Sequence, residues 1–109
     1  MAYDEKLADR IRKALARRKG MSERKMFGGI AFMLGGNMCC GVVKDELMVR
    51  VGPAAYEKSL ALAGARPMDF TGRPMTGMLY VSARAIRDDK ALASWVKRGA
   101  DYAASLPSK

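Results

Sequence analysis

The chain has 109 residues, half of them hydrophobic, and its 20 basic and 11 acidic residues give a formal net charge of +9. This length suits one domain with an ordinary core, and the apolar content is too high for a disordered chain. No apolar run approaches the roughly 18 residues that span a bilayer, and the charged N-terminus is unlike a signal peptide. We therefore expect a single cytoplasmic domain over residues 1–109, with no membrane partner and a charge that suits anionic partners.

The composition excludes several kinds of chemistry. The chain has no histidine, which removes the Ser-His-Asp and Cys-His catalytic arrangements and every metal site that needs imidazole. The glycine pairs match no phosphate-binding loop, and the scattered acids suggest no catalytic carboxylate pair. We therefore expect no enzyme activity, and we assign no catalytic residue, metal ligand or cofactor.

The only two cysteines are adjacent, at Cys39 and Cys40. On a regular strand, neighbouring side chains point to opposite faces, so the pair would not easily form a disulfide. We interpret both as small apolar packing residues. The alternative is a redox role for whichever thiol faces solvent.

The N-terminal segment predicts a helix over residues 4–19. Asp4 suits the N-cap position, and apolar residues recur behind it at helical spacing. Basic residues occupy the last turn, where the helix dipole favours cations, and Gly20 is a natural left-handed stop.

Three strands are predicted next. Residues 26–34 and 38–43 are apolar, and the Gly35-Gly36-Asn37 segment between them tolerates the positive φ of a hairpin turn. The Gly28-Gly29 pair inside the first run indicates a bulge or a close backbone approach. Residues 47–51 alternate as a third strand, so the three form an antiparallel meander.

The second half predicts a helix over residues 54–63, a loop at 65–67 and a short extended segment over 68–71. A strand over 78–81 and a last helix near 88–104 follow. The order is α-β-β-β-α-β-β-α, with the strands grouped rather than alternating with helices. We therefore predict an α+β fold, an antiparallel sheet of about five strands with the helices packed on one face.

Most of the excess charge lies in residues 10–25, where eight basic residues and one acid give a net charge of +7. Two interpretations stay open. The segment is either the solvated face of a helix with dipole-matched cations, or a surface for an anionic partner, nucleic acid or an acidic protein. The candidate residues for such a surface are Arg10, Lys13, Arg17, Arg18, Lys19, Arg24 and Lys25.

A pattern that begins with a basic pair and Met-Phe-Gly-Gly resembles the N-terminal domain of the TfoX/Sxy competence regulators, and the match runs from about residue 4 to 104. The matching positions are Arg24-Lys25-Met26-Phe27-Gly28-Gly29, Phe32, Gly36, Met38, Leu47-Met48-Val49-Arg50-Val51, Tyr56, Gly64, Phe70, Pro74-Met75, Tyr80 and Trp95-Val96.

This resemblance implies an α+β domain similar to the secretion-chaperone-like folds, with no catalytic residues. It also implies an association with the control of DNA-uptake genes. The full-length regulators carry a second, C-terminal domain and are thought to act as coactivators with a cyclic-AMP receptor protein. We expect this chain to represent the N-terminal-type domain alone.

From these observations we expect a non-enzymatic binding module linked to competence-type transcriptional regulation, acting on a nucleic acid or an acidic protein through the basic segment. The alternative is a protein-interaction or self-assembly module without nucleic-acid contact. In that case a homodimer would bury an apolar, methionine-rich face of the sheet.

Overall fold

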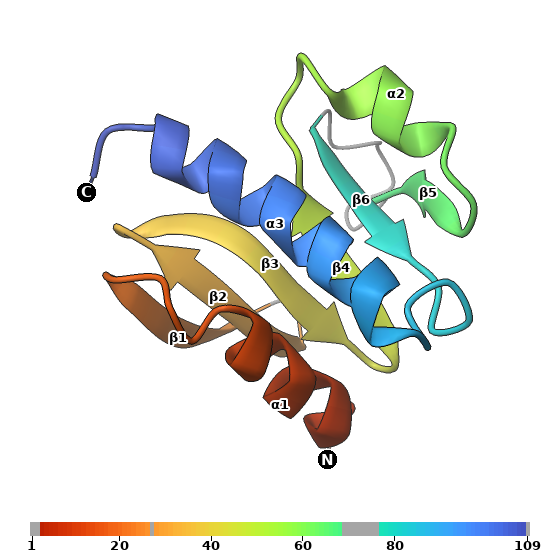
Figure 1. The fold of residues 1–109 in the computed structure, drawn as a ribbon, viewed down its shortest axis with the longest axis horizontal. Helices are drawn as coiled ribbons and strands as arrows, with labels where there is room; N and C mark the ends of the chain where they lie inside the picture. The colour runs from red at the N-terminus through yellow and green to blue at the C-terminus, as the bar shows by residue number, and fades with distance from the viewer. Residues whose placement is uncertain (1–2, 27, 69–76, 109) are drawn as a thin grey trace.

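The computed structural model describes residues 3–26, 28–68 and 77–108. Within these residues, six strands form one antiparallel sheet, accompanied by three helices (Figure 1). The elements in chain order are α1 (Glu5–Ala14), β1 (Met21–Met26), β2 (Gly29–Leu34), β3 (Asn37–Val43), β4 (Glu46–Arg50), α2 (Tyr56–Leu60), β5 (Ala65–Pro67), β6 (Met78–Val81) and α3 (Asp89–Ser105). The predicted α+β class and order of elements are confirmed, with one further strand, β1, before the predicted meander.

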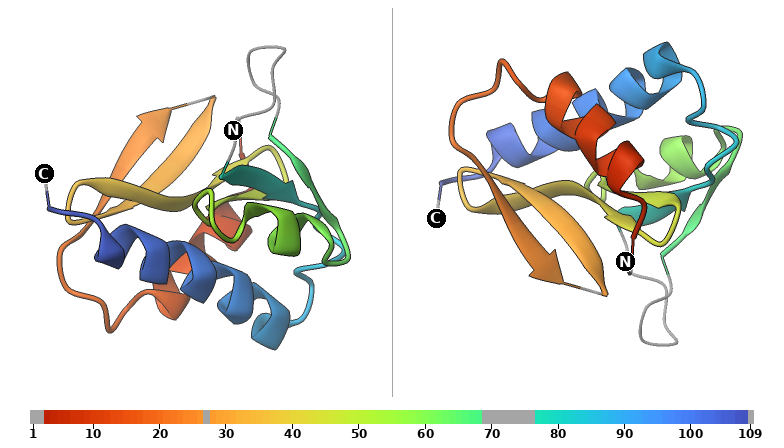
Figure 2. Two further views of the ribbon diagram at one scale, coloured as in Figure 1. Left: turned by 90° about the horizontal axis from the view of Figure 1, so that it is seen from above. Right: turned by 90° about the horizontal axis from the view of Figure 1, so that it is seen from below.

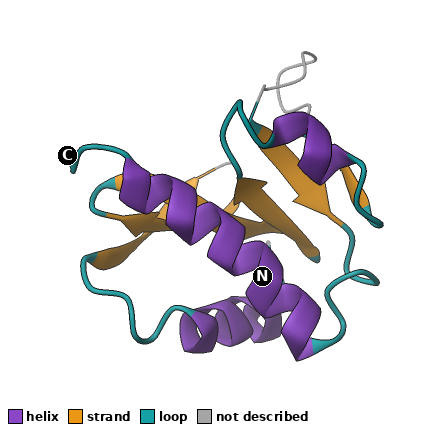
Figure 3. Ribbon diagram, turned by 45° about the horizontal axis from the view of Figure 1, so that its top comes forward, coloured by secondary structure: helices purple, strands orange, loops and turns teal. Residues whose placement is uncertain are grey.

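The sheet runs in the order β1-β2-β3-β4-β6-β5, and α1 and α3 lie side by side on one of its faces (Figures 2 and 3). The main core fills the space between these two helices and the sheet. α1 contributes Leu7 and Ile11, α3 contributes Trp95 and Val96, and Leu60 of α2 packs against the same cluster. In the described part of the chain, no helix has the length and apolar character needed to cross a membrane.

The first helix is shorter than predicted. Asp4 caps it as expected, because its Oδ1 accepts hydrogen bonds from two backbone N–H groups of the first turn, at 2.9 and 3.1 Å. The helix then ends at Ala14 rather than at residue 19. The alanine-rich, basic sequence favours a longer helix, but the chain turns at Leu15, whose side chain is buried in the core.

β1 occupies residues 21–26, most of which had no predicted secondary structure. It pairs with β2 along its whole length, from Met21 opposite Leu34 to Met26 opposite Gly29. The predicted strand over 26–34 is therefore two elements. The close approach expected at the glycine pair is confirmed, because a Cβ at Gly29 would collide with the carbonyl oxygen of Val42.

The cysteine pair sits at an irregularity between β2 and β3. Phe32 pairs with Cys40 but Met33 pairs with Met38, which leaves Cys39 as an extra residue on β3. Both thiols consequently belong to the main core, both are fully buried, and their Sγ atoms lie 3.7 Å apart. The prediction of opposite faces is wrong, because it assumed a regular strand. The alternative of a solvent-facing thiol is also wrong, because neither thiol is exposed.

The second half differs from prediction mainly in its short elements. α2 spans Tyr56–Leu60 instead of residues 54–63, and the predicted loop at 65–67 is strand β5, which pairs with β6. The predicted extended segment over 68–71 falls outside the described residues beyond Met68. The same is true of four positions that carry the family resemblance: Phe27, Phe70, Pro74 and Met75.

α3 agrees with its prediction. Asp88 caps it by accepting a hydrogen bond from the Ala91 N–H at 3.2 Å. Its middle passes very close to the sheet at Gly99, where a Cβ would collide with the carbonyl oxygen of Cys39. This approach lets Trp95 and Val96 reach the core.

The opposite face of the sheet is rich in methionine. Met38, Met48, Met68 and Met78 form a second buried cluster, and Met26 and Met33 pack against it. The strand methionines therefore fill space between side chains on this face, as flexible thioether side chains commonly do.

Candidate functional site

Arg10, the first residue of the predicted basic surface, is fastened to the beginning of α3. Its Nε donates to Asp89 Oδ1 at 3.0 Å, and its Nη2 donates to the carbonyl oxygens of Ile86 and Arg87 at 2.8 and 3.1 Å. These contacts join two segments that are 76 to 79 positions apart in the chain. The guanidinium of Arg10 thus holds α1 against α3.

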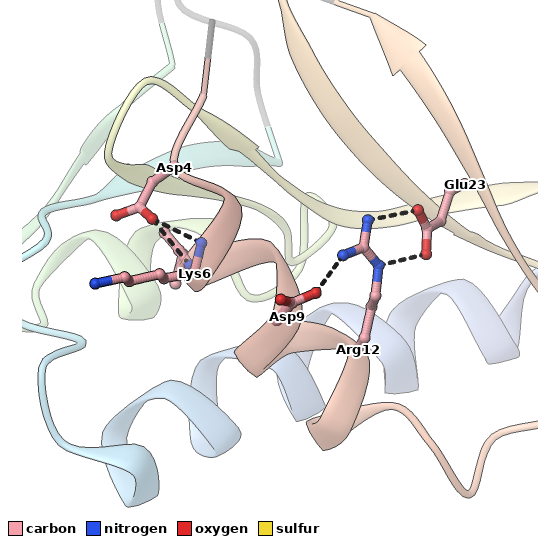
Figure 4. Close-up of polar contacts among 6 residues, drawn as sticks. Asp4, Lys6, Asp9, Arg12 and Glu23 are labelled. Carbon is pink, nitrogen blue, oxygen red and sulfur yellow. Dashed lines mark hydrogen bonds and ion pairs between the residues drawn. The ribbon is translucent and has the colours of Figure 1, made fainter. Parts of the chain in front are cut away.

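Arg12 joins α1 to β1 (Figure 4). Its Nε and Nη2 donate to the two carboxylate oxygens of Glu23 at 2.7 and 2.9 Å, and Nη1 pairs with Asp9. The hydrogen bonds from Arg12 lower the pKa of Glu23. The hydrogen bonds to Glu23 and then Asp9 raise the pKa of Arg12. Two acids therefore neutralise this cation within the protein.

Arg18 reaches the C-terminal half of α3. Its Nη2 donates to Asp101 Oδ1 at 2.8 Å, while Lys97 donates to Asp101 Oδ2 at 2.8 Å. Hydrogen bonds from Lys97 and then from Arg18 lower the pKa of Asp101. Arg18 is therefore half-buried and paired, like Arg10 and Arg12.

Five cations of the basic segment remain available for a partner, and Arg24 is one of them. Lys13, Arg17, Lys19 and Lys25 are exposed, and none makes an ion pair or a side-chain hydrogen bond with any residue in the described part of the chain. We call these four residues the free-cation set. They come from the last turn of α1, the connection to β1, and β1 itself.

The strand register separates Arg24 from this set. Lys25 lies opposite Ile30, a main-core residue, and so shares the helix-covered face of the sheet. Arg24 lies opposite Ala31, which belongs to the methionine cluster, and so is on the other face. Of the seven predicted residues, two are therefore paired internally and five are exposed and unpaired among the described residues, with Arg24 on the opposite face of the sheet from Lys25.

A pocket of about 320 Å³ opens where α1 passes into β1. Leu15, Met21 and Phe32 supply its apolar lining, and Arg12 and Arg18 line it with their already paired guanidinium groups. Exposed Ala16 lies at its margin. We call this the α1–β1 pocket.

A second hollow of similar volume lies between α1 and α3 and is lined in part by Arg10, Lys13 and Ala14. Its polar lining includes the Arg10–Asp89 pair that fastens the two helices. Lys13 is thus the one member of the free-cation set that lines this hollow.

The sequence did not reveal the α1–β1 pocket. Leu15 and Phe32 both look like ordinary core residues, and only the turn at Leu15 brings them beside Met21. The partner acids Asp89 and Asp101 also gave no signal, because they lie on α3, 79 and 83 positions from the arginines they bind.

The homodimer alternative requires a broad apolar surface. Among the described residues, Leu62 is the only exposed large hydrophobic side chain, at 39%. The methionine cluster is covered at its centre, since Met48 and Met68 are fully buried. The described surface thus provides no specific support for self-assembly, which stays a prediction.

Fold and surface together define an α+β domain with an antiparallel sheet, two helices across one face and a cationic edge where α1 meets β1. The chain belongs to the TfoX N-terminal domain family, whose family model matches residues 13–103. This confirms the resemblance noted in the sequence. The family is linked to the regulation of competence and DNA uptake. Neither the curated proteins nor the solved structures gave a significant match to the chain.

Proposed function

We propose that the protein is a non-enzymatic binding module in competence-type transcriptional regulation, and that it binds an anionic partner through the free-cation set. The observation that carries this proposal is the division of the basic segment. Arg10, Arg12 and Arg18 are paired with acids of the same chain, whereas Lys13, Arg17, Lys19 and Lys25 are exposed without such acids in the described residues.

Paired and unpaired cations differ in the free-energy cost of binding a partner. An arginine that already bridges a carboxylate must break that contact before it can bind a partner, whereas an exposed lysine or arginine only exchanges counterions and water. Exposed cations within one short segment of a small domain attract anionic surfaces over roughly a Debye length, about 8–10 Å at physiological salt. Binding should therefore weaken steeply as salt is raised.

The test is a fluorescence-polarisation titration at low salt with two labelled anions, a DNA duplex and a short peptide of Asp and Glu. The variant Arg17→Glu/Lys19→Glu should lose affinity for whichever probe the wild type binds. The control is Lys58→Glu/Arg84→Glu, which makes the same change in net charge at exposed positions outside the basic segment. Equal affinity of the two double variants, or no binding of either probe by the wild type, would overturn the proposal.

A further inference from the structure

The α1–β1 pocket lies next to part of the free-cation set. Arg17 and Lys19 are on the turn between pocket residues Leu15 and Met21, and Lys25 follows Glu23 on the same face of β1. The volume of about 320 Å³ is at the lower end of the range for ligand pockets, roughly 300–1,000 Å³. It is large enough for one side chain of a partner, but not for an extended ligand.

The lining of the pocket favours an apolar group. Phe32 and Leu15 are 2% and 4% exposed, and the Arg12 guanidinium lies 5.8 Å from the centroid of the Phe32 ring. Because Glu23 and Asp9 already accept hydrogen bonds from Arg12, the polar wall does not require a polar ligand. The pocket thus has an apolar wall formed by Leu15, Met21 and Phe32 and a polar wall that also includes Ser22 and Glu23, and the exposed cations Arg17 and Lys19 lie on the adjoining turn.

We infer that the α1–β1 pocket and the free-cation set together bind an acidic peptide segment that carries one aromatic or branched apolar side chain. The apolar side chain enters the pocket and packs against half-buried Met21, with the buried Leu15 and Phe32 behind it. Carboxylates on either side of it pair with Arg17, Lys19 and Lys25. This inference rests on the proposed function, and it selects an acidic protein as the anionic partner.

Charge alone does not separate this partner from a nucleic acid, but the pocket does. Bases stack on open aromatic faces, whereas Arg12 lies over the Phe32 ring and leaves half-buried Met21 as the apolar surface that a single side chain can reach. A phosphate backbone has no apolar side chain to place in the pocket. An acidic peptide with one apolar anchor satisfies both parts of the site.

The experiment uses three fluorescein-labelled probes at low salt. The first is a short peptide of Asp and Glu with one central Phe, the second is the same peptide with Ser in place of Phe, and the third is a DNA duplex. Burying a Phe side chain stabilises a complex enough that the first peptide should bind roughly tenfold more tightly than the second. This comparison is made on the unaltered protein.

A pocket variant and a matched control locate the effect. Ala16→Trp places a large ring at the margin of the α1–β1 pocket, whereas Ala14→Trp places the same ring in the other hollow, against α3. Both alanines are exposed. Ala16→Trp should abolish the preference for Phe over Ser, and Ala14→Trp should keep it. Circular dichroism establishes that each variant is folded.

The outcomes separate this inference from the proposed function. If both peptides bind equally and Arg17→Glu/Lys19→Glu weakens both, the pocket inference is overturned while the proposed function stands. If the duplex binds and neither peptide does, an acidic peptide is again excluded and the anionic partner is a nucleic acid. If none of the three probes binds, both proposals fail.

Discussion

Arg10 and Lys13 lie one turn apart on α1, but Arg10 is hydrogen-bonded to the start of α3 whereas Lys13 is exposed and unpaired among the described residues. We expect Arg10→Met to destabilise the protein and Lys13→Met to leave its stability nearly unchanged. Each substitution removes one positive charge and keeps an unbranched apolar stem, so the pair differs mainly in the contacts that are lost. Arg10 loses two hydrogen bonds to the carbonyls of Ile86 and Arg87 and an ion pair with Asp89.

The magnitude follows from these contacts. Each hydrogen bond contributes about 0.5–1.5 kcal/mol to stability. The ion pair adds only about 0.2–1 kcal/mol, because the Asp89 side chain is 89% exposed and well solvated. We therefore expect Arg10→Met to lower the free energy of unfolding by about 2 kcal/mol and the melting temperature by roughly 8 °C. Lys13→Met should stay within about 0.5 kcal/mol of the wild type.

Urea unfolding followed by far-UV circular dichroism measures both changes, and Arg10→Lys provides an intermediate case. A lysine keeps the charge but has a single nitrogen, so it cannot reproduce the three-acceptor geometry. It should recover roughly half of the loss, about 1 kcal/mol. If Arg10→Met and Lys13→Met prove equally stable, the division of the basic segment into structural and available cations is refuted.

Three other changes test further contacts. Gly99→Ala should lower the free energy of unfolding by about 2 kcal/mol despite the better helix propensity of alanine, because the new methyl group collides with the Cys39 carbonyl. The pKa of Glu23 is lowered from its ordinary value of 4.5, so the stability advantage of the wild type over Glu23→Gln should be complete above about pH 5.5 and fall away at lower pH. The thiols of Cys39 and Cys40 should react with a thiol-specific reagent only after unfolding, because both are fully buried.

Each of these has a clear contrary result. If Gly99→Ala has the same melting temperature as the wild type, then α3 does not pack as closely on β3 as described. An advantage over Glu23→Gln that persists unchanged at pH 3 would contradict the pairing of Glu23 with Arg12 (Figure 4). The hydrogen bond with Cys39 and then burial raise the pKa of Cys40. Rapid labelling of either thiol in native buffer would be incompatible with that environment.

The regular parts of the fold were predictable because local and long-range preferences agree. α3 has its capping residue, Asp88, and an apolar stripe that includes Trp95 and Val96, so its predicted and observed bounds nearly coincide. The alternation over residues 47–51 places Val49 and Met48 on opposite faces of the strand, and the structure has Val49 in the main core and Met48 in the methionine cluster. In both elements, the spacing of apolar residues in the sequence predicts which side chains are buried.

The missed elements are those that tertiary contacts determine. β1 has four consecutive exposed polar residues and no alternation, because it is an edge strand that β2 holds in place. The helix-favouring residues after Ala14 leave the helix as Leu15 enters the core and Arg18 reaches Asp101. The bulge at Cys39 arises from the pairing of two strands, which neither strand encodes alone.

The candidate site was predictable in place but not in detail. The charge excess drew attention to residues 10–25, and their role as a binding surface stays a prediction. Which cations are available depends on acids elsewhere in the fold, and which face each occupies depends on the β1–β2 register. Arg24 and Lys25 are neighbours in sequence but lie on opposite faces of the sheet, so a list of basic residues could not define the surface.

The central claim is that the free-cation set and the α1–β1 pocket form the binding surface. The most direct measurement is an NMR titration of the ¹⁵N-labelled protein with the acidic Phe peptide, following each backbone amide. We expect the shifts to concentrate between Lys13 and Lys25, including Leu15 and Met21, and to be absent from α2. Shifts that centre on α2 and β5, or that spread evenly over the protein, would contradict the account.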